Sequence, residues 1–250
     1  MVPNSEDDRE ILTNGYRSFL GEARTLAQFV HPYIVRVRDF FTANNTGDLV
    51  MDCYDGVPLG DYLAAHGGTL SADESLRIIA PILEGLEAIH NKGFLHRDIK
   101  PQNIYLTREL IPILLDFGAA RLAVGEKSQS LSVIPTPGYA PYEQYHSKGH
   151  QGPWTDIYAL GAALYYMLTG KRPPDALERM VEDDLIAPND IDPRIPQYVS
   201  AAVLGALKLS PTERPQSAGE FLTALSSNRQ PITNHVDGID DATRYARSGA

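Results

Sequence analysis

The stretch His96–Asn103 carries the residues of this sequence that are best suited to chemistry. It reads His-Arg-Asp-Ile-Lys-Pro-Gln-Asn, and Asp116 opens a second motif, Asp-Phe-Gly, further along the chain. Asn103 and Asp116 supply oxygen ligands of the kind that Mg²⁺ prefers. Asp98 and Lys100 add a carboxylate and a cation, which suit a reaction that depends on positioning and charge neutralisation. The alternative interpretation of Asp98 and Asn103 is a polar turn without chemistry.

A helix and a β-hairpin are expected before this stretch. Apolar residues recur every three or four positions from Gly15, and His31-Pro32 ends that helix because a proline disfavours helix in the residue before it. Residues 34–41 and 49–53 are rich in β-branched and aromatic side chains. They flank a turn cluster at residues 44–47, which predicts a hairpin.

Two helices and two strands are expected around the stretch itself. A short helix is predicted over residues 59–65, and Ser71-x-x-Glu74 is a capping-box pattern that opens a long helix to about His90. Residues 103–106 and 111–115 read as short strands.

The rest of the chain is expected to be mostly helical. Trp154–Leu168 is apolar nearly all round and predicts a buried helix, whereas residues 119–138 have no period and predict a long functional loop. Three further helices are expected, over residues 175–184, 195–208 and 216–225.

Composition narrows the class of protein. The chain has 250 residues, 43% of them hydrophobic, enough for one domain with a real core. Its net charge of −10 argues against a nucleic-acid or membrane-surface binder. The single cysteine, Cys53, excludes an internal disulfide and favours a reducing, cytoplasmic setting. The apolar run Ile157–Leu168 is short of the ~20 residues that a membrane span needs.

Taken together, the motifs and their order resemble the eukaryotic-like serine/threonine protein kinases of bacteria. The resemblance covers roughly residues 15–225. It implies an α+β, protein-kinase-like fold, with a largely helical C-terminal lobe and a partial N-terminal lobe of one helix and a hairpin. Residues 1–14 are expected to be a disordered or extended arm, and residues 226–250 a mobile polar tail. Between them, residues 15–54 would form the partial N-terminal lobe and residues 55–225 the C-terminal lobe.

The resemblance assigns roles to the motif residues. Asp98 would accept a hydrogen bond from the substrate hydroxyl, and Lys100 would stabilise the charge on the transferred phosphoryl group and mark serine/threonine specificity. Asn103 and Asp116 would hold Mg²⁺. Thr136 would contact Asp98 and Lys100 and shape the site for a protein substrate with serine or threonine.

By the same resemblance, four residues would surround the purine of ATP. Met51 would stand behind the adenine, backbone groups of Asp52 and Tyr54 would bond its edge, and Tyr105 would lie beneath it. The end of a strand without a nucleotide role is the alternative interpretation.

Other matched residues would have structural or regulatory roles. His96 would pack under Phe117, which precedes Gly118 of the second motif, and would form an internal column with Leu26 and Phe41. Arg97 would pair with a phosphate on the 119–138 loop. The loop serines at 128, 130 and 132, with Thr136, are candidates for that phosphate, and solvated hydroxyls are the alternative for the serines.

Two scaffold contacts are also implied. Glu143, in the Pro141-Tyr142-Glu143 version of a motif that usually has a second proline, would form a buried ion pair with Arg214. Asp156, at the start of the buried helix, would bind the backbone of the His-Arg-Asp loop.

The family's Gly-rich loop and strand lysine do not match this sequence, since its first lysine is Lys92. Glu22, which matches the helix glutamate that pairs with that lysine, is therefore expected to be unpaired. We expect a chain that starts just after the lysine, a hairpin with an unpaired edge, and little transfer activity with Mg-ATP. A protein partner that completes or caps the N-terminal lobe is a further expectation.

Three functions stay open on the sequence. The first is a serine/threonine protein kinase domain, which upstream in-frame codons for a Gly-rich loop and a strand lysine would support. The second is a kinase-like binding module, which would capture a protein but bind Mg-ATP weakly. The third is a phosphotransferase for a small molecule, which the Thr136-Pro137-Gly138-Tyr139 loop disfavours.

Overall fold

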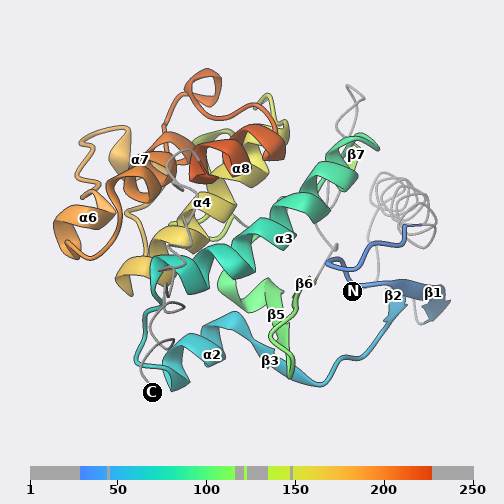
Figure 1. Ribbon diagram of the computed structural model, residues 1–250. Coiled ribbons are helices and arrows are strands. Elements are labelled where there is room, and N and C mark those ends of the chain that lie inside the picture. The colour runs from blue at the N-terminus through green and yellow to red at the C-terminus, as the bar shows by residue number, and fades with distance from the viewer. Residues whose placement is uncertain (1–28, 44–45, 116–120, 123–134, 147–148, 227–250) are drawn as a thin grey trace, which may run out of the picture.

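The β-hairpin predicted near the start of the chain is present, with a shorter turn than expected. In this computed structural model β1 (Val37–Ala43) and β2 (Thr46–Met51) pair antiparallel, with Val37 opposite Met51 and Ala43 opposite Thr46 (Figure 1). The ladder includes Thr46 and Gly47, which the sequence placed in the turn, because they lie opposite Ala43 and Thr42. The structure describes residues 29–43, 46–115, 121–122, 135–146 and 149–226.

The hairpin joins the helical body at one end only. Backbone hydrogen bonds run from Val35 N–H to the Leu114 carbonyl (2.9 Å) and from Leu114 N–H to the Tyr33 carbonyl (2.8 Å). Val37 is 2% exposed, whereas Phe41, farther out along β1, is 50% exposed. Phe41, predicted to belong to an internal column, is thus half exposed, and the predicted column partners Leu26 and Phe117 lie outside the described residues.

The long helix begins where the capping box predicts. α3 (Ala72–His90) has Ser71 as its N-cap: the Glu74 N–H donates to Ser71 Oγ, and the Ser71 N–H donates to the Glu74 carboxylate. The short helix α2 (Leu59–Ala65) also has the predicted bounds.

Short antiparallel sheets flank the functional stretch. β5 (Ile104–Thr107) lies between β6 (Pro112–Leu114) and β3 (Gly56–Pro58), a strand that the sequence did not predict. β4 (Phe94–Leu95) pairs with β7 (Arg121–Leu122), which lies in the segment expected to be a loop.

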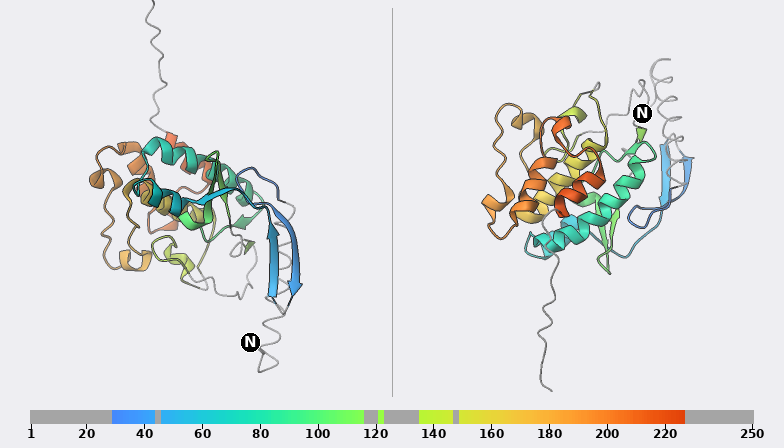
Figure 2. Two further views of the ribbon diagram at one scale, coloured as in Figure 1. Left: turned by 90° about the horizontal axis from the view of Figure 1, so that it is seen from below. Right: turned by 45° about the horizontal axis from the view of Figure 1, so that its top comes forward.

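The predicted apolar helix is the centre of the core. α4 (Pro153–Thr169) packs against α3, α7 (Gln197–Ala206) and α8 (Ala218–Ser226) (Figures 1 and 2). A Cβ on Gly161 of α4 would lie 2.7 Å from the Ala206 Cβ, so the glycine allows α7 to approach closely. None of the helices in the described residues is long and apolar enough to cross a membrane.

One predicted helix is much shorter than expected. α5 covers only Ala176–Arg179, whereas the sequence predicted a helix over residues 175–184. The buried guanidinium of Arg179 binds the Asp183 carboxylate (2.8 and 3.1 Å) and the Leu207 carbonyl (2.9 Å). α6 (Pro188–Ile191) was not predicted. The predictions for residues 1–28 and 227–250 lie outside the described residues.

Candidate active site

The His-Arg-Asp loop runs from β4 through the 3-10 turn Pro101–Asn103 into β5, and three predicted residues converge on the carboxylate of its Asp98. Lys100 Nζ donates to both oxygens of Asp98, at 2.9 and 2.8 Å. Asn103 Nδ2 donates to Asp98 Oδ2 at 2.9 Å, and Thr136 Oγ1 donates to Asp98 Oδ1 at 3.2 Å. Lys100 Nζ also donates to Thr136 Oγ1 at 3.3 Å. The contacts predicted for Thr136 are therefore present.

The orientation of Asn103 suits an oxygen ligand for a metal ion. Its Nδ2 donates to both the carbonyl (2.8 Å) and the carboxylate of Asp98, so Oδ1 is the side-chain atom left for another partner. Its backbone carbonyl accepts the Leu115 N–H at 2.8 Å. Leu115 immediately precedes Asp116 in sequence. The second motif, Asp116-Phe117-Gly118, lies outside the described residues, as do Glu22 and Leu26.

Asp156 fixes the backbone of the loop, as the sequence predicted. It lies in the first turn of α4 and accepts the N–H groups of His96 (2.9 Å) and Arg97 (2.8 Å). His90 Nε2 is 2.8 Å from its Oδ2. Burial alone would raise the pKa of Asp156, but hydrogen bonds and charge from His90, with the Arg97 N–H, hold that pKa below its ordinary value. His90 was missed, although it ends the long helix just before the motif.

Arg97 has a left-handed backbone (φ 69°), which a residue with a Cβ adopts at a cost of about 1–2 kcal/mol. The surrounding structure imposes this conformation, because Asp156 binds the Arg97 N–H and Gln144 Nε2 donates to the Arg97 carbonyl at 2.8 Å. Gln144 was missed by the sequence interpretation. Its position next to Glu143, inside a motif, was the available signal.

The histidine of the loop is fully buried. His96 Nε2 lies 2.8 Å from the Leu115 carbonyl, so the loop and β6 are tied together through this side chain. Its predicted partner Phe117, and the loop hydroxyls at 128, 130 and 132 that would pair with Arg97 when phosphorylated, lie outside the described residues.

The predicted ion pair between Glu143 and Arg214 is present and buried. Arg214 Nη1 and Nη2 donate to Glu143 Oε1 (2.7 Å) and Oε2 (3.2 Å), and Thr155 Oγ1 also donates to Oε1 (3.0 Å). The side chains are 0% and 2% exposed. The pair therefore joins the 3-10 turn Tyr142–Gln144, which carries Gln144, to the helical body.

The four residues predicted to bind adenine come from three places: Met51 from β2, Asp52 and Tyr54 from the link between β2 and β3, and Tyr105 from β5. Met51 ends β2 and is 42% exposed. Asp52 pairs with Arg38, and its backbone N–H donates to the Arg36 carbonyl. The Tyr105 hydroxyl donates to the carbonyls of Tyr54 (3.2 Å) and Gly56 (2.8 Å), so it ties β5 to this link.

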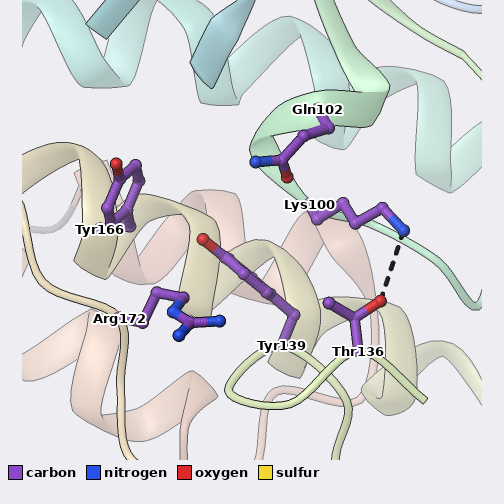
Figure 3. Close-up of a pocket in the computed structure, with 6 residues that line it drawn as sticks. All are labelled: Lys100, Gln102, Thr136, Tyr139, Tyr166 and Arg172. Atoms are coloured by element: carbon purple, nitrogen blue, oxygen red, sulfur yellow. Dashed lines mark hydrogen bonds between the residues drawn. The ribbon is translucent and has the colours of Figure 1, made fainter. Parts of the chain in front are cut away.

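A pocket of about 410 Å³ opens beside the Asp98 cluster (Figure 3). Two of its lining residues, Lys100 and Thr136, belong to the cluster. The others are Gln102, Tyr139, Tyr166 and Arg172. The sequence interpretation gave Gln102, Tyr166 and Arg172 no role. Gln102 lies inside the motif itself, whereas Tyr166 and Arg172 come from α4 and the segment after it.

Comparisons with known proteins agree with this geometry. The model of the family described as "Protein kinase domain" matches residues 3–222. The chain is 33% identical over 247 residues to serine/threonine-protein kinase pkn2 of Myxococcus xanthus, covering 93% of this chain and 29% of that protein. It is 32% identical over 250 residues to serine/threonine-protein kinase PknB of Mycobacterium leprae, covering 94% of this chain and 40% of that protein.

A solved structure described as "PpkA-294 apo form" is also similar. The TM-score is 0.73 with 35% sequence identity, over 90% of this chain and 79% of that one. Among the curated relatives, by contrast, the chain spans only 29% of pkn2 and 40% of PknB.

Proposed function

Since this chain belongs to the protein kinase family, we propose that it is a serine/threonine protein kinase domain that transfers the γ-phosphoryl group of ATP to protein hydroxyls. The observation that carries the proposal is the cluster in which Lys100, Asn103 and Thr136 all donate to Asp98. A polar turn without chemistry would not require a lysine, an amide and a threonine from a distant segment to donate to one carboxylate.

Each residue of the cluster has a proposed part in the transfer. Asp98 accepts a hydrogen bond from the substrate hydroxyl and directs its oxygen toward the γ-phosphorus. A bond forms from that oxygen to phosphorus, the bond to the leaving ADP breaks, and the hydroxyl proton passes to the Asp98 carboxylate. Lys100, which donates to Asp98 in this structure, would neutralise the charge on the transferred group.

The metal-binding part of the proposal concerns Asn103 and Asp116. The Asn103 amide already uses its nitrogen on Asp98, so its oxygen fits a hard cation. Mg²⁺ held by Asn103 and Asp116 would neutralise negative charge on the phosphates of ATP. Within the chain itself, Asn103 also keeps Asp98 oriented.

The finer parts of the function are also proposals. ATP would lie against the link that contains Met51, Asp52 and Tyr54, with Tyr105 beneath it, and a protein partner would complete or cap the hairpin. The absence of a nucleic-acid role agrees with the acidic charge of −10, and a cytoplasmic location agrees with the single cysteine.

The test measures transfer of labelled phosphate from Mg-ATP to a mixed serine/threonine peptide library. It uses the longest reading frame that contains this chain. We expect transfer that falls at least about a hundredfold in Asp98→Asn, since general acid–base groups contribute about 10²–10⁴. Transfer that survives this substitution would contradict the role of Asp98. Absence of transfer together with capture of one protein would favour the binding-module function.

A further inference from the structure

Two cations, Lys100 and Arg172, line the pocket beside Asp98, and only Lys100 is paired with an acid among the described residues. No Asp or Glu is among its lining residues, which include Lys100 and Arg172. Asp98 already binds Lys100 in two hydrogen bonds. Arg172 differs, because none of the ion pairs in the described part of the chain involves it. An exposed, unneutralised guanidinium is thus present in a protein of net charge −10.

The position of Arg172 is fixed relative to the cluster. Gly138 has a φ of +82°, and a Cβ there would lie 2.9 Å from the Pro173 carbonyl oxygen. The Thr136–Tyr139 turn is therefore packed directly on the segment that carries Arg172. Figure 3 shows Arg172 beside Tyr139 on one side of the pocket, and Lys100 with Thr136 on the other. A substrate that presents its hydroxyl to Asp98 would bring a neighbouring side chain within reach of Arg172.

The tyrosines complete a site that tolerates negative charge. Tyr139 is 4% exposed, and its burial raises the pKa of its hydroxyl to about 12. It is therefore neutral at physiological pH and does not repel an anion. Tyr166 is half-buried on α4, and Gln102 is exposed on the opposite rim, where its amide can donate a hydrogen bond.

We propose that this pocket selects protein substrates that carry an acidic side chain close to the accepting hydroxyl, with Arg172 as the residue that binds it. The proposal rests on the proposed kinase function and adds a substrate class to it. A guanidinium recognises a carboxylate and a phosphate by the same paired hydrogen bonds. Aspartate, glutamate and a previously phosphorylated residue are therefore the chemical candidates.

The experiment uses peptides with one threonine in a neutral background. Asp, Asn, Lys or phosphoserine is placed in turn at each of the three positions before the threonine and each of the three positions after it. Transfer from Mg-ATP gives kcat/KM, and fluorescence anisotropy of labelled peptides gives binding without catalysis. The protein is the longest reading frame that contains the chain. Comparison of the Asp and phosphoserine peptides distinguishes a simple acidic substrate from a previously phosphorylated one.

We expect the best-placed acidic peptide to exceed its Lys counterpart by about fivefold to tenfold, since one partly solvated charge pair contributes little more. Arg172→Glu should reverse that order. Lys171→Glu makes the same charge change at the adjacent exposed residue, which does not line the pocket, and should leave the order unchanged.

The outcomes separate this proposal from the proposed function. Transfer at equal rates to the Asp, Asn and Lys peptides would overturn the role of Arg172 and leave the kinase function standing. Equal effects of Arg172→Glu and Lys171→Glu would also overturn it. Acid-selective binding without any transfer would support the pocket and count against the kinase function, whereas the absence of both would overturn both.

Discussion

Replacement of Arg214 by methionine tests how the active-site scaffold is stabilised. The guanidinium is 0% exposed and donates to both oxygens of Glu143, which is 2% exposed. It also binds the carbonyls of Lys208 (2.7 Å) and Leu209 (2.9 Å). Methionine fills much of the space but leaves a buried carboxylate whose remaining donor, among the residues that the structure describes, is Thr155. Removal of one partner of such a pair costs about 3–5 kcal/mol.

The assay is urea unfolding with the midpoint and slope fitted together, supported by thermal unfolding. A loss of about 3–5 kcal/mol corresponds to a fall in Tm of about 6–20 °C for a domain of this size. Arg194→Met is the matched control, because Arg194 pairs with Asp192 at the surface and is itself 88% exposed. We expect the control to change the free energy of unfolding by less than about 1 kcal/mol.

A double variant isolates the cause of the loss. Glu143→Gln combined with Arg214→Met removes both charges, so it should recover stability relative to Arg214→Met alone. The reasoning is refuted if Arg214→Met costs no more than Arg194→Met. It is also refuted if the double variant loses the sum of the two single losses, since that would show that the buried charge left behind is not the source of the cost.

Three further predictions concern the loop, a turn and a helix cap. The folded-state pKa of Asp156 is lowered, so its carboxylate stabilises the fold above the unfolded pKa of about 3.9, and this stabilisation is lost as pH falls through the folded value. The free energy of unfolding should therefore fall less steeply with decreasing pH in Asp156→Asn than in the unchanged chain. Gly138→Ala should destabilise by about 1–2 kcal/mol in urea because of its left-handed φ, whereas Gly205→Ala, whose Cβ would meet open space in α7, should stabilise slightly. Ser71→Ala should cost about 1 kcal/mol in the same assay through loss of the capping box, and an unchanged midpoint would contradict that role.

Local patterns predicted the elements on which the site is built. The capping box at Ser71 fixed the start of α3 within one residue, because the N-cap bonds involve only neighbours in sequence. The apolar run that forms α4 was also identified, because a run that is apolar on every side is typical of a helix buried on every side. The contacts of Asp156, Glu143 and Thr136 followed from the family resemblance, which carries long-range information that periodicity lacks.

Features set by distant partners were missed. Residues 175–184 have helical character, yet α5 stops at Arg179, whose side chain binds the Leu207 carbonyl on a remote segment. β7 was assigned to a loop, since two residues cannot show alternation. Arg172 had no motif to identify it, because the pocket exists only when the end of α4 and the Thr136 turn come together.

The contacts that orient the catalytic loop come from the helical body. The His96 and Arg97 N–H groups are bound by Asp156 of α4, and Gln144 binds the Arg97 carbonyl from a turn that the Glu143 ion pair secures. The hairpin contributes none of these bonds. In the proposed function the two tasks would therefore be separate: the described body would position the accepting hydroxyl, whereas the nucleotide would depend on the link after β2. Loss of nucleotide binding and loss of substrate selection are consequently expected to be independent defects, with mutations in different parts of the chain.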